Sequence, residues 1–302
     1  MTGPQSLLLI LLALIGGASY VFIRVATPAF GPVVLMAARV LVAGFLLLPF
    51  AGPVKIVSGL KDNWRRYLLL GAFNAALPYS LIATAALHLN ASLLSIINAL
   101  TPLQTAAISA IWLGDRLGAK KAVGLLGGLV GVVIAVGWQP IAVSRAVASA
   151  ALCSVLASFF YGLGGVYAKK HCSGMNPLNM AAGQQFAAAL LLSPLALASL
   201  PDRPVPPDAI RAMLVLAVFA TALTSWLTLV MIREVGPTKT LTVTFMMPVF
   251  GIVLGNLTLN EAVTPGTVTG LIVILASVCL VTEAGLTRLR PAGVRREHTK
   301  QP

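Results

Sequence analysis

The sequence predicts an all-α integral membrane protein of ten transmembrane helices, arranged as two inverted five-helix repeats. The prediction rests on an apolar composition, on ten apolar stretches of membrane-spanning length, and on an internal repeat at an offset of 146 residues. Hydrophobic residues make up 58% of the 302-residue chain and charged residues only 10%, whereas a soluble domain carries roughly 25% charged residues. The apolar excess must face a lipid bilayer, which is the first partner we expect.

Ten segments are long and apolar enough to cross the bilayer. A helix needs roughly 20 apolar residues to span the hydrocarbon core, and about 17 suffice. Short polar or Pro- and Gly-rich loops separate the segments, so no stretch remains for a soluble domain, and residues 287–302 form a polar tail. The ten predicted spans cover residues 6–23, 33–50, 67–87, 92–113, 122–138, 148–168, 179–200, 211–232, 241–259 and 267–284.

The distribution of basic residues orients the predicted spans. Of the 21 Lys and Arg residues, 16 lie in the tail and in loops on one side, four lie in loops on the other side, and Arg39 lies within the second span. Because basic residues collect on the cytoplasmic side, both termini and the tail are expected in the cytoplasm. The bias also accounts for the net charge of +13 without a nucleic-acid partner, which would need a folded polar surface.

Sliding the sequence against itself by 146 residues aligns similar residues without a gap. Proline falls on proline, acid on acid and base on base, and such matches are informative in an apolar chain. The first repeat covers residues 1–146 and the second covers residues 147–286. Because each holds five spans, an odd number, the two must cross the membrane in opposite directions, as in many secondary transporters. The most informative matches are Gly16 with Gly162, Arg24 with Lys170, Pro102 with Pro248, Asp115 with Glu261 and Gly124 with Gly270.

The repeated motifs resemble those of EamA-type carriers. The first helices of the two repeats contain GGASYVFIR from Gly16 and GLGGVYAKK from Gly162. The fourth helices contain ASLLSIINALTPLQTAAISAIWLGDRLG and KTLTVTFMMPVFGIVLGNLTLNEAVT, each with an acid that follows a proline after twelve residues. On these motifs the chain resembles the drug/metabolite transporter superfamily over its whole length, and looks closest to the bacterial aromatic and neutral amino-acid exporters.

This resemblance implies a carrier in the bacterial inner membrane that exports amino acids or similar small molecules by alternating access through a central cavity. We expect no cofactor and no enzymatic activity, and a monomer or weak oligomer. The sequence departs from the family in having Ile15 where a tryptophan is common, and Tyr161 at the matching position of the second repeat. Arg39 of the second span is matched by Gln185. These departures leave the identity of the substrate open.

Prolines in the middle of spans indicate the first candidate substrate contacts. A proline donates no hydrogen bond to the carbonyl four residues earlier, so Pro102 frees the carbonyl of Asn98, and Pro248 frees that of its repeat partner, Thr244. Two such carbonyls near the midplane are suited to accept the ammonium group of an amino acid. The alternative is that each proline only bends its helix and a neighbour satisfies the carbonyl.

Further candidates lie on neighbouring spans. Tyrosine and tryptophan deep in a span suit the wall of a cavity for apolar or aromatic side chains, and glutamine in hydrocarbon needs a polar environment. We therefore expect a cavity between the third, fourth, eighth and ninth spans, closed by the first and sixth. The predicted substrate-binding residues are Asn98, Thr244, Tyr79, Ser80, Tyr161, Gln184, Gln185 and Trp226, and the predicted helix kinks are Pro78, Pro102 and Pro248.

The fifth span contains a glycine-rich run, GLLGGLVG, from Gly124 to Gly131. Small residues four apart let two helices in a membrane approach closely. The run therefore predicts tight packing against another helix rather than a substrate contact, and Gly266 and Gly270 form a weaker copy in the tenth span.

Other classes of function are disfavoured by the scatter of the reactive residues. The three cysteines and three histidines show no metal-ligand or disulfide spacing, so neither a metal nor a catalytic site is predicted. A proton-coupled multidrug or cation exporter is the main alternative, but such carriers commonly use a carboxylate within the membrane. The eight acids lie in loops, at span boundaries or in the tail, which favours a facilitator: Asp62, Asp202, Asp208, Asp115, Glu234, Glu261, Glu283 and Glu297.

Overall fold

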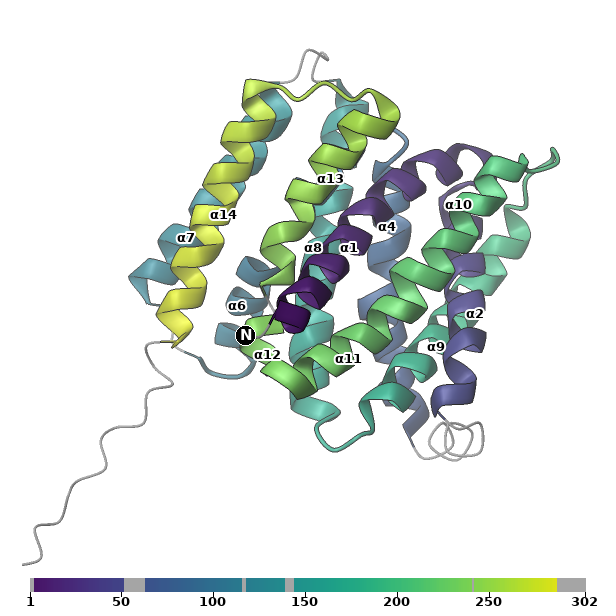
Figure 1. The fold of residues 1–302 in the computed structure, drawn as a ribbon, viewed down its shortest axis with the longest axis horizontal. Helices are drawn as coiled ribbons and strands as arrows, with labels where there is room; N and C mark the ends of the chain where they lie inside the picture. The colour runs from purple at the N-terminus through teal and green to yellow at the C-terminus, as the bar shows by residue number, and fades with distance from the viewer. Residues whose placement is uncertain (1–2, 52–62, 116–117, 139–143, 241, 287–302) are drawn as a thin grey trace, which may run out of the picture.

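The computed structural model describes residues 3–51, 63–115, 118–138, 144–240 and 242–286, and the regular secondary structure in these ranges is entirely helical (Figure 1). In this part of the chain, nine helical segments are long and apolar enough to cross a membrane, and a tenth, Val243–Leu259, is apolar but shorter. The prediction of a ten-helix membrane protein is therefore confirmed. The predicted tail, residues 287–302, lies outside the described residues.

The helices follow one another in the predicted order. The first repeat contains α1 (Gly3–Phe30), α2 (Pro32–Ala51), a third span over Asn63–Ala85 that includes η1 (Ala72–Ala76) and α4 (Leu77–Ala85), α5 (Ala91–Asn98), α6 (Thr101–Trp112) and α7 (Ala119–Gly137). The second repeat contains α8 (Arg145–His171), α9 (Pro177–Ala198), α10 (Pro207–Ala217), η2 (Val218–Leu223), α11 (Thr224–Val235), α12 (Pro237–Thr240), α13 (Val243–Leu259) and α14 (Pro265–Leu286). The fourth span consists of α5 and α6, and the eighth of α10, η2 and α11.

Each repeat carries a π-helix at the same position of its third span. η1 begins at Ala72 and η2 begins at Val218, and these positions are separated by the repeat offset. A π-helix widens the helical turn, so carbonyls lose their usual donors and the helix beyond it presents a different face. In η2 the hydroxyl of Thr221 donates a hydrogen bond of 2.9 Å to the carbonyl of Leu216, and so satisfies a carbonyl of the widened turn.

The three predicted kinks have different local structures. Pro102 lies just after a break between α5 and α6, and the hydroxyl of Thr101 donates a 2.7 Å hydrogen bond to the carbonyl of Asn98. A neighbour thus satisfies the carbonyl that Pro102 leaves without an N–H, as in the alternative interpretation of the sequence. Pro78 lies in the first turn of α4, directly after η1, and Pro248 lies inside α13.

The two repeats interlock along the centre of the bundle. α1 packs against α13 and α10 of the second repeat, and α8 packs against α6 and α4 of the first. Gly17 permits the close approach of α1 and α13, because a Cβ atom added there would lie only 2.7 Å from the carbonyl oxygen of Met247. Figure 1 shows α7 and α14 together at one edge and α2 and α9 together at the other. Each of these edge pairs takes one helix from each repeat, so the seam between the repeats runs through the middle of the molecule and out to both edges.

The glycine-rich run of the fifth span packs as predicted. α7 lies along α14 over its length, and a Cβ atom added to Gly131 would lie 3.1 Å from the carbonyl oxygen of Gly270. A Cβ atom on Gly124 would collide with the side chain of Val281. These glycines hold α7 and α14 together at the edge of the bundle, away from its centre.

Candidate functional site

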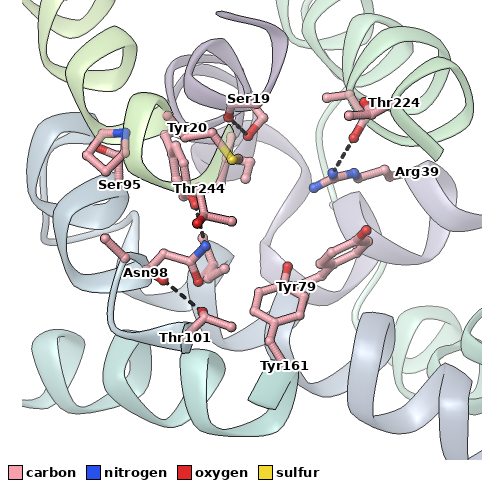
Figure 2. A pocket seen from close by; sticks show the side chains of 17 residues that line it. Ser19, Tyr20, Arg39, Tyr79, Ser95, Asn98, Thr101, Tyr161, Thr224 and Thr244 are labelled. Carbon is pink, nitrogen blue, oxygen red and sulfur yellow. Dashed lines mark hydrogen bonds between the residues drawn. The ribbon is translucent and has the colours of Figure 1, made fainter. Parts of the chain in front are cut away.

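A cavity of about 280 Å³ lies at the centre of the bundle, between the two repeats. Seven spans line it, namely the first, second, third, fourth and sixth, together with the eighth and ninth. Figure 2 shows polar side chains from both repeats around this space. The polar residues that line the cavity are Ser19, Tyr20, Arg39, Tyr79, Ser95, Asn98, Thr101, Tyr161, Thr224 and Thr244.

Asn98, the last residue of α5, forms one wall of the cavity. Its amide nitrogen, Nδ2, donates a 2.6 Å hydrogen bond to the hydroxyl of Tyr20 on α1. Its carbonyl oxygen, Oδ1, is buried and has no hydrogen-bond partner among the described residues. A buried acceptor without a donor costs free energy, and this oxygen belongs to a residue that lines the cavity.

Arg39, on α2, lies on the opposite wall (Figure 2). The residue is only 4% exposed. Its Nε donates a 2.8 Å hydrogen bond to the hydroxyl of Thr221, and its Nη2 lies 3.4 Å from the carbonyl oxygen of Ala220. Because Thr221 and Ala220 belong to η2, the π-helix positions the guanidinium group at the cavity.

Two tyrosines form an aromatic side of the cavity. The rings of Tyr79 and Tyr161 have their centroids 6.1 Å apart at an interplanar angle of 63°, an edge-to-face arrangement that aromatic pairs favour. The guanidinium carbon of Arg39 lies 4.1 Å from the centroid of the Tyr79 ring. Tyr79 therefore contributes an apolar surface to the cavity and also stabilises the neighbouring cation.

The predicted site residues are brought together only in part. Asn98, Thr244, Tyr79 and Tyr161 line the central cavity, as does the predicted kink Pro248. The positions that do not line it are Ser80, Gln184, Gln185, Trp226, Pro78 and Pro102. Trp226 is 45% exposed and lies in an apolar groove on the outside of the bundle, beside Leu46 and Phe50.

Gln184 and Gln185 point to different places because neighbours on a helix lie on different faces. Gln184 lines a second hollow of about 330 Å³ between α9 and α11, where its Oε1 lies 3.5 Å from Nδ2 of Asn74. Gln185 is buried, and its Oε1 has no partner among the described residues. The second hollow shares Tyr79 and Thr224 with the central cavity, so it adjoins the cavity on the side of the bundle at which α9 begins.

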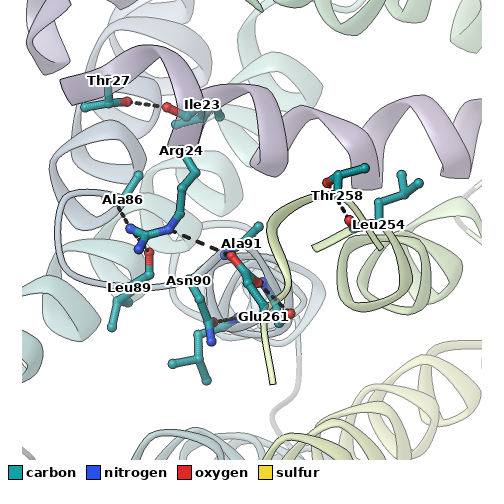
Figure 3. Close-up of polar contacts among 12 residues, drawn as sticks. Ile23, Arg24, Thr27, Ala86, Leu89, Asn90, Ala91, Leu254, Thr258 and Glu261 are labelled. Atoms are coloured by element: carbon teal, nitrogen blue, oxygen red, sulfur yellow. Dashed lines mark hydrogen bonds and ion pairs between the residues drawn. The ribbon is translucent and has the colours of Figure 1, made fainter. Parts of the chain in front are cut away.

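The opposite end of the bundle is held by Glu261, in the turn between α13 and α14. Its carboxylate accepts hydrogen bonds from the backbone N–H of Ala91 at 2.7 Å, from that of Ser92 at 3.1 Å, and from the Ser92 hydroxyl at 2.9 Å. These groups form the N-terminus of α5, where a negative charge is favourable. Arg24 completes the cluster, with Nε 3.8 Å from the carboxylate and Nη1 bonded to the carbonyls of Ala86 and Leu89 (Figure 3).

The repeat partners of this ion pair are apart. Lys170 corresponds to Arg24, and Asp115 corresponds to Glu261. The ammonium group of Lys170 donates to the carbonyl of Trp112 at 3.3 Å and lies over its ring, whereas Asp115 is exposed. Neither residue takes part in the ion pairs found in the described part of the chain. One end of the bundle is thus tied by Arg24 and Glu261, while the equivalent pair at the other end is separated.

Each half of the chain matches a known family separately. The EamA-like transporter family matches residues 4–137 and again residues 148–283. The chain belongs to the EamA-like transporter family. As an EamA-like transporter it is a multi-pass membrane protein that moves small molecules across the bilayer, and the family description names transport rather than an enzymatic activity.

A bacterial relative and a solved structure agree with this assignment. YvbV of Bacillus subtilis (strain 168), described as an uncharacterized transporter, is 30% identical over 285 residues, which cover 91% of this chain and 90% of that protein. A solved structure described as "Crystal structure of protein" matches with a TM-score of 0.65 and 18% identity, over 96% of this chain and 100% of the other. At that identity the solved structure supports the fold alone, and neither description names a substrate.

Six polar cavity residues were absent from the predicted site: Arg39, Tyr20, Thr224, Ser19, Ser95 and Thr101. For Arg39 the signal was present, because it is the one Lys or Arg away from the ends of a predicted span, and an ionisable residue at that depth usually marks a functional site. Tyr20 and Thr224 carry no such signal, since hydroxyl residues are common in spans and often serve helix packing.

Proposed function

We propose that the protein exports amino acids with neutral or aromatic side chains, or similar zwitterionic metabolites, across the bacterial plasma membrane. The observation that carries the proposal is the central cavity, in which polar groups face the rings of Tyr79 and Tyr161. Its volume of about 280 Å³ suits a small metabolite, since sites for drug-sized ligands occupy roughly 300–1,000 Å³. The rings offer an apolar surface to the side chain, and the buried Oδ1 of Asn98 offers an acceptor to an ammonium group.

Transport is proposed to proceed by alternating access. With both termini in the cytoplasm, Arg24 and Glu261 would close the outer end of the cavity, and the adjoining second hollow would lie on its cytoplasmic side. This conformation would take up substrate from inside the cell. The inverted repeat supports the opposite conformation as well, because exchanging the roles of the two repeats opens the outer end at a similar free energy.

The carrier is proposed to act as a facilitator. Proton-driven carriers commonly hold a carboxylate within the membrane, and no Asp, Glu or His is among the described residues that line the cavity. Asp62, Glu297 and the side chain of Glu283 lie outside the described part of the chain. The alternative of a proton-coupled exporter of organic cations is disfavoured by Arg39, because its positive charge in the cavity wall repels a cation.

The experiment that tests the substrate class is uptake into proteoliposomes that contain the purified protein. A panel of labelled amino acids, nucleosides and organic cations is compared with protein-free liposomes. We expect uptake of neutral and aromatic amino acids, and exchange of external labelled substrate with unlabelled substrate inside. Uptake of cations or nucleosides without uptake of any amino acid would refute the proposed substrate class.

Coupling is tested in the same proteoliposomes by imposing a pH gradient of about two units. For a facilitator, substrate equilibrates to equal concentrations with or without the gradient. Accumulation against the concentration gradient that a protonophore abolishes would show that the carrier is coupled to protons and that the facilitator proposal is wrong.

A further inference from the structure

Arg39 is a buried charge for which the described residues provide no countercharge. It lies in the middle of α2, is 4% exposed, and takes part in neither of the ion pairs found in the described part of the chain. A cation at the centre of a transmembrane helix costs roughly 2.5–3.5 kcal/mol even on scales that allow for relaxation. The stack on Tyr79 offsets part of this cost, but a ring leaves the positive charge unneutralised.

The hydrogen bonds of Arg39 leave part of the guanidinium group available. A guanidinium group has five N–H donors. The Nε donor is used by the hydroxyl of Thr221, and one Nη2 donor by the carbonyl of Ala220. The nearest acceptor to Nη1 is the sulfur of Met36, at 3.9 Å, and sulfur is a weak acceptor. At least one N–H on each terminal nitrogen therefore has no oxygen acceptor among the described residues.

The remaining donors face the cavity. Arg39 lines the cavity, and Figure 2 shows its guanidinium group directed into that space from the wall opposite Asn98. Two parallel N–H groups on terminal nitrogens match the two oxygens of a carboxylate, which binds arginine in a bidentate manner. The contacts to η2 and Tyr79 hold the guanidinium plane in place before any ligand arrives.

The cation occurs in only one of the two repeats. The position equivalent to Arg39 is Gln185 on α9, which is neutral, buried and absent from the cavity lining. A single arginine balances one negative charge. A phosphate group carries up to two negative charges and would call for further Lys or Arg residues, but Arg39 is the one Lys or Arg among the described residues that line the cavity.

We infer that Arg39 binds the carboxylate group of the transported molecule, an inference that rests on the proposed function and specifies its binding site. The carboxylate neutralises the guanidinium group through the terminal nitrogens. The ammonium group of a zwitterion then lies toward Oδ1 of Asn98, which is buried without a donor. The two poles of the substrate are recognised by side chains from the second and fourth spans of the first repeat.

The first test needs no variant. Binding of labelled L-phenylalanine to the wild-type protein is competed with L-phenylalaninamide, phenethylamine and 3-phenylpropionate. We expect 3-phenylpropionate, which keeps the carboxylate, to compete, and the amide and the amine, which lack it, to compete at least tenfold more weakly. Equal competition by the amide and by unlabelled L-phenylalanine would overturn the inference.

The second test replaces the cation while keeping polarity. Arg39→Gln should weaken binding of L-phenylalanine roughly 10- to 100-fold, the range for losing a charge-assisted hydrogen bond, and should leave phenethylamine binding unchanged or stronger. Arg39→Lys keeps the positive charge but lacks the planar pair of terminal N–H groups. Its affinity for L-phenylalanine should therefore lie between those of the wild-type protein and Arg39→Gln. Arg65→Gln, at an exposed position, is the matched control. A loss of affinity for phenylalanine and phenethylamine by the same factor in Arg39→Gln would identify a structural role and overturn the inference.

Failure of the proposed function is distinguishable from failure of this inference. If the wild-type protein transports no amino acid, the competition is repeated with the transported compound of the panel. A transported compound that carries a carboxylate and depends on Arg39 supports the inference without the amino-acid proposal. Transport of a compound that lacks a carboxylate, at equal rates by wild-type protein and Arg39→Gln, overturns the inference.

Discussion

The guanidinium group of Arg24 lies 3.8 Å from the carboxylate of Glu261, and the two residues come from opposite repeats. Glu261 at the same time binds the two backbone N–H groups that begin α5. The pair therefore joins α1, the fourth span and the turn before α14 at one end of the cavity. Because the carboxylate is buried and Arg24 is partly exposed, most of the attachment depends on Glu261.

Glu261→Gln should weaken this end of the bundle. The substitution removes the negative charge that three donors and Arg24 share, and losing charge-assisted hydrogen bonds costs about 2 kcal/mol. We expect a lower melting temperature of the detergent-solubilised protein. Asp208→Asn is the matched control, since Asp208 pairs with Arg211 at an exposed site and exposed pairs contribute little. Equal melting temperatures for Glu261→Gln and wild-type protein would contradict the assigned role.

Lys170 and Asp115 should form the equivalent ion pair when the cavity opens to the other side. They are the repeat partners of Arg24 and Glu261 and are apart in the present conformation. Asp115→Lys and Lys170→Asp should each reduce the transport rate roughly fivefold, and the double variant should recover much of it, because a coupling of about 1 kcal/mol is typical for such a pair. The measurement is a double-mutant cycle in proteoliposomes. Additive losses in the double variant would exclude the pairing.

Asn98→Leu should lower transport while the amount of protein in the membrane stays normal. Leucine is similar in size but removes the hydrogen bond to Tyr20 and the Oδ1 acceptor in the cavity. We expect a rate at least tenfold lower, measured as initial uptake per amount of protein, because the site loses its hydrogen bonds to the polar end of the substrate. Trp226→Ala should behave like wild-type protein, since Trp226 lies in the outer groove. Normal transport by Asn98→Leu would show that Asn98 does not bind the substrate.

Gly17→Val should prevent correct assembly of α1 with α13. A Cβ atom at Gly17 would lie 2.7 Å from the Met247 carbonyl oxygen and 2.8 Å from the backbone nitrogen of Gly251, and backbone cannot move aside as a flexible side chain can. We expect a severe loss of monodisperse protein on size-exclusion chromatography. Gly165→Val, at a mid-helix glycine with open space around it, should give a normal yield. Equal yields of the two variants would contradict the packing described for the seam.

A reporter fused after Pro302 should behave as a cytoplasmic tag. The expectation follows from the excess of Lys and Arg on one side of the predicted spans. A C-terminal fluorescent protein should fluoresce, and a C-terminal alkaline phosphatase should be inactive. High phosphatase activity would show that the C-terminus lies outside the cytoplasm. The present conformation would then open to the side opposite to the one proposed.

The spans and the repeat were accessible from the sequence because both are one-dimensional patterns. Hydrocarbon thickness sets the length of an apolar stretch, and a duplication leaves matches such as Pro102 with Pro248 at a fixed offset. The glycine contacts of α7 were predictable for the same reason, since small residues four apart report on packing whichever helix is the partner.

The composition of the cavity wall was only partly predictable, because it depends on which helices face each other. Arg39 meets Thr221 of the other repeat, and no pattern within α2 reports on η2. Trp226 follows η2, and a π-helix turns the residues beyond it onto a different face. Nothing in the sequence marks Val218–Leu223 as a π-helix. The depth of Trp226 in its span therefore predicted a place in the cavity wall, whereas in the structure this side chain faces the outside of the bundle.

The single charge of Arg39 has an electrical consequence. A zwitterion has no net charge, so the loaded carrier and the empty carrier both hold the single positive charge of Arg39 as they change conformation. A membrane potential acts on such a charge with up to roughly 2.3 kcal/mol per 100 mV. A negative potential inside the cell would therefore favour the inward-facing conformation of the loaded and the empty carrier alike. A full transport cycle would move no net charge, so the voltage would change the rates of the two steps and leave the final distribution of substrate unchanged.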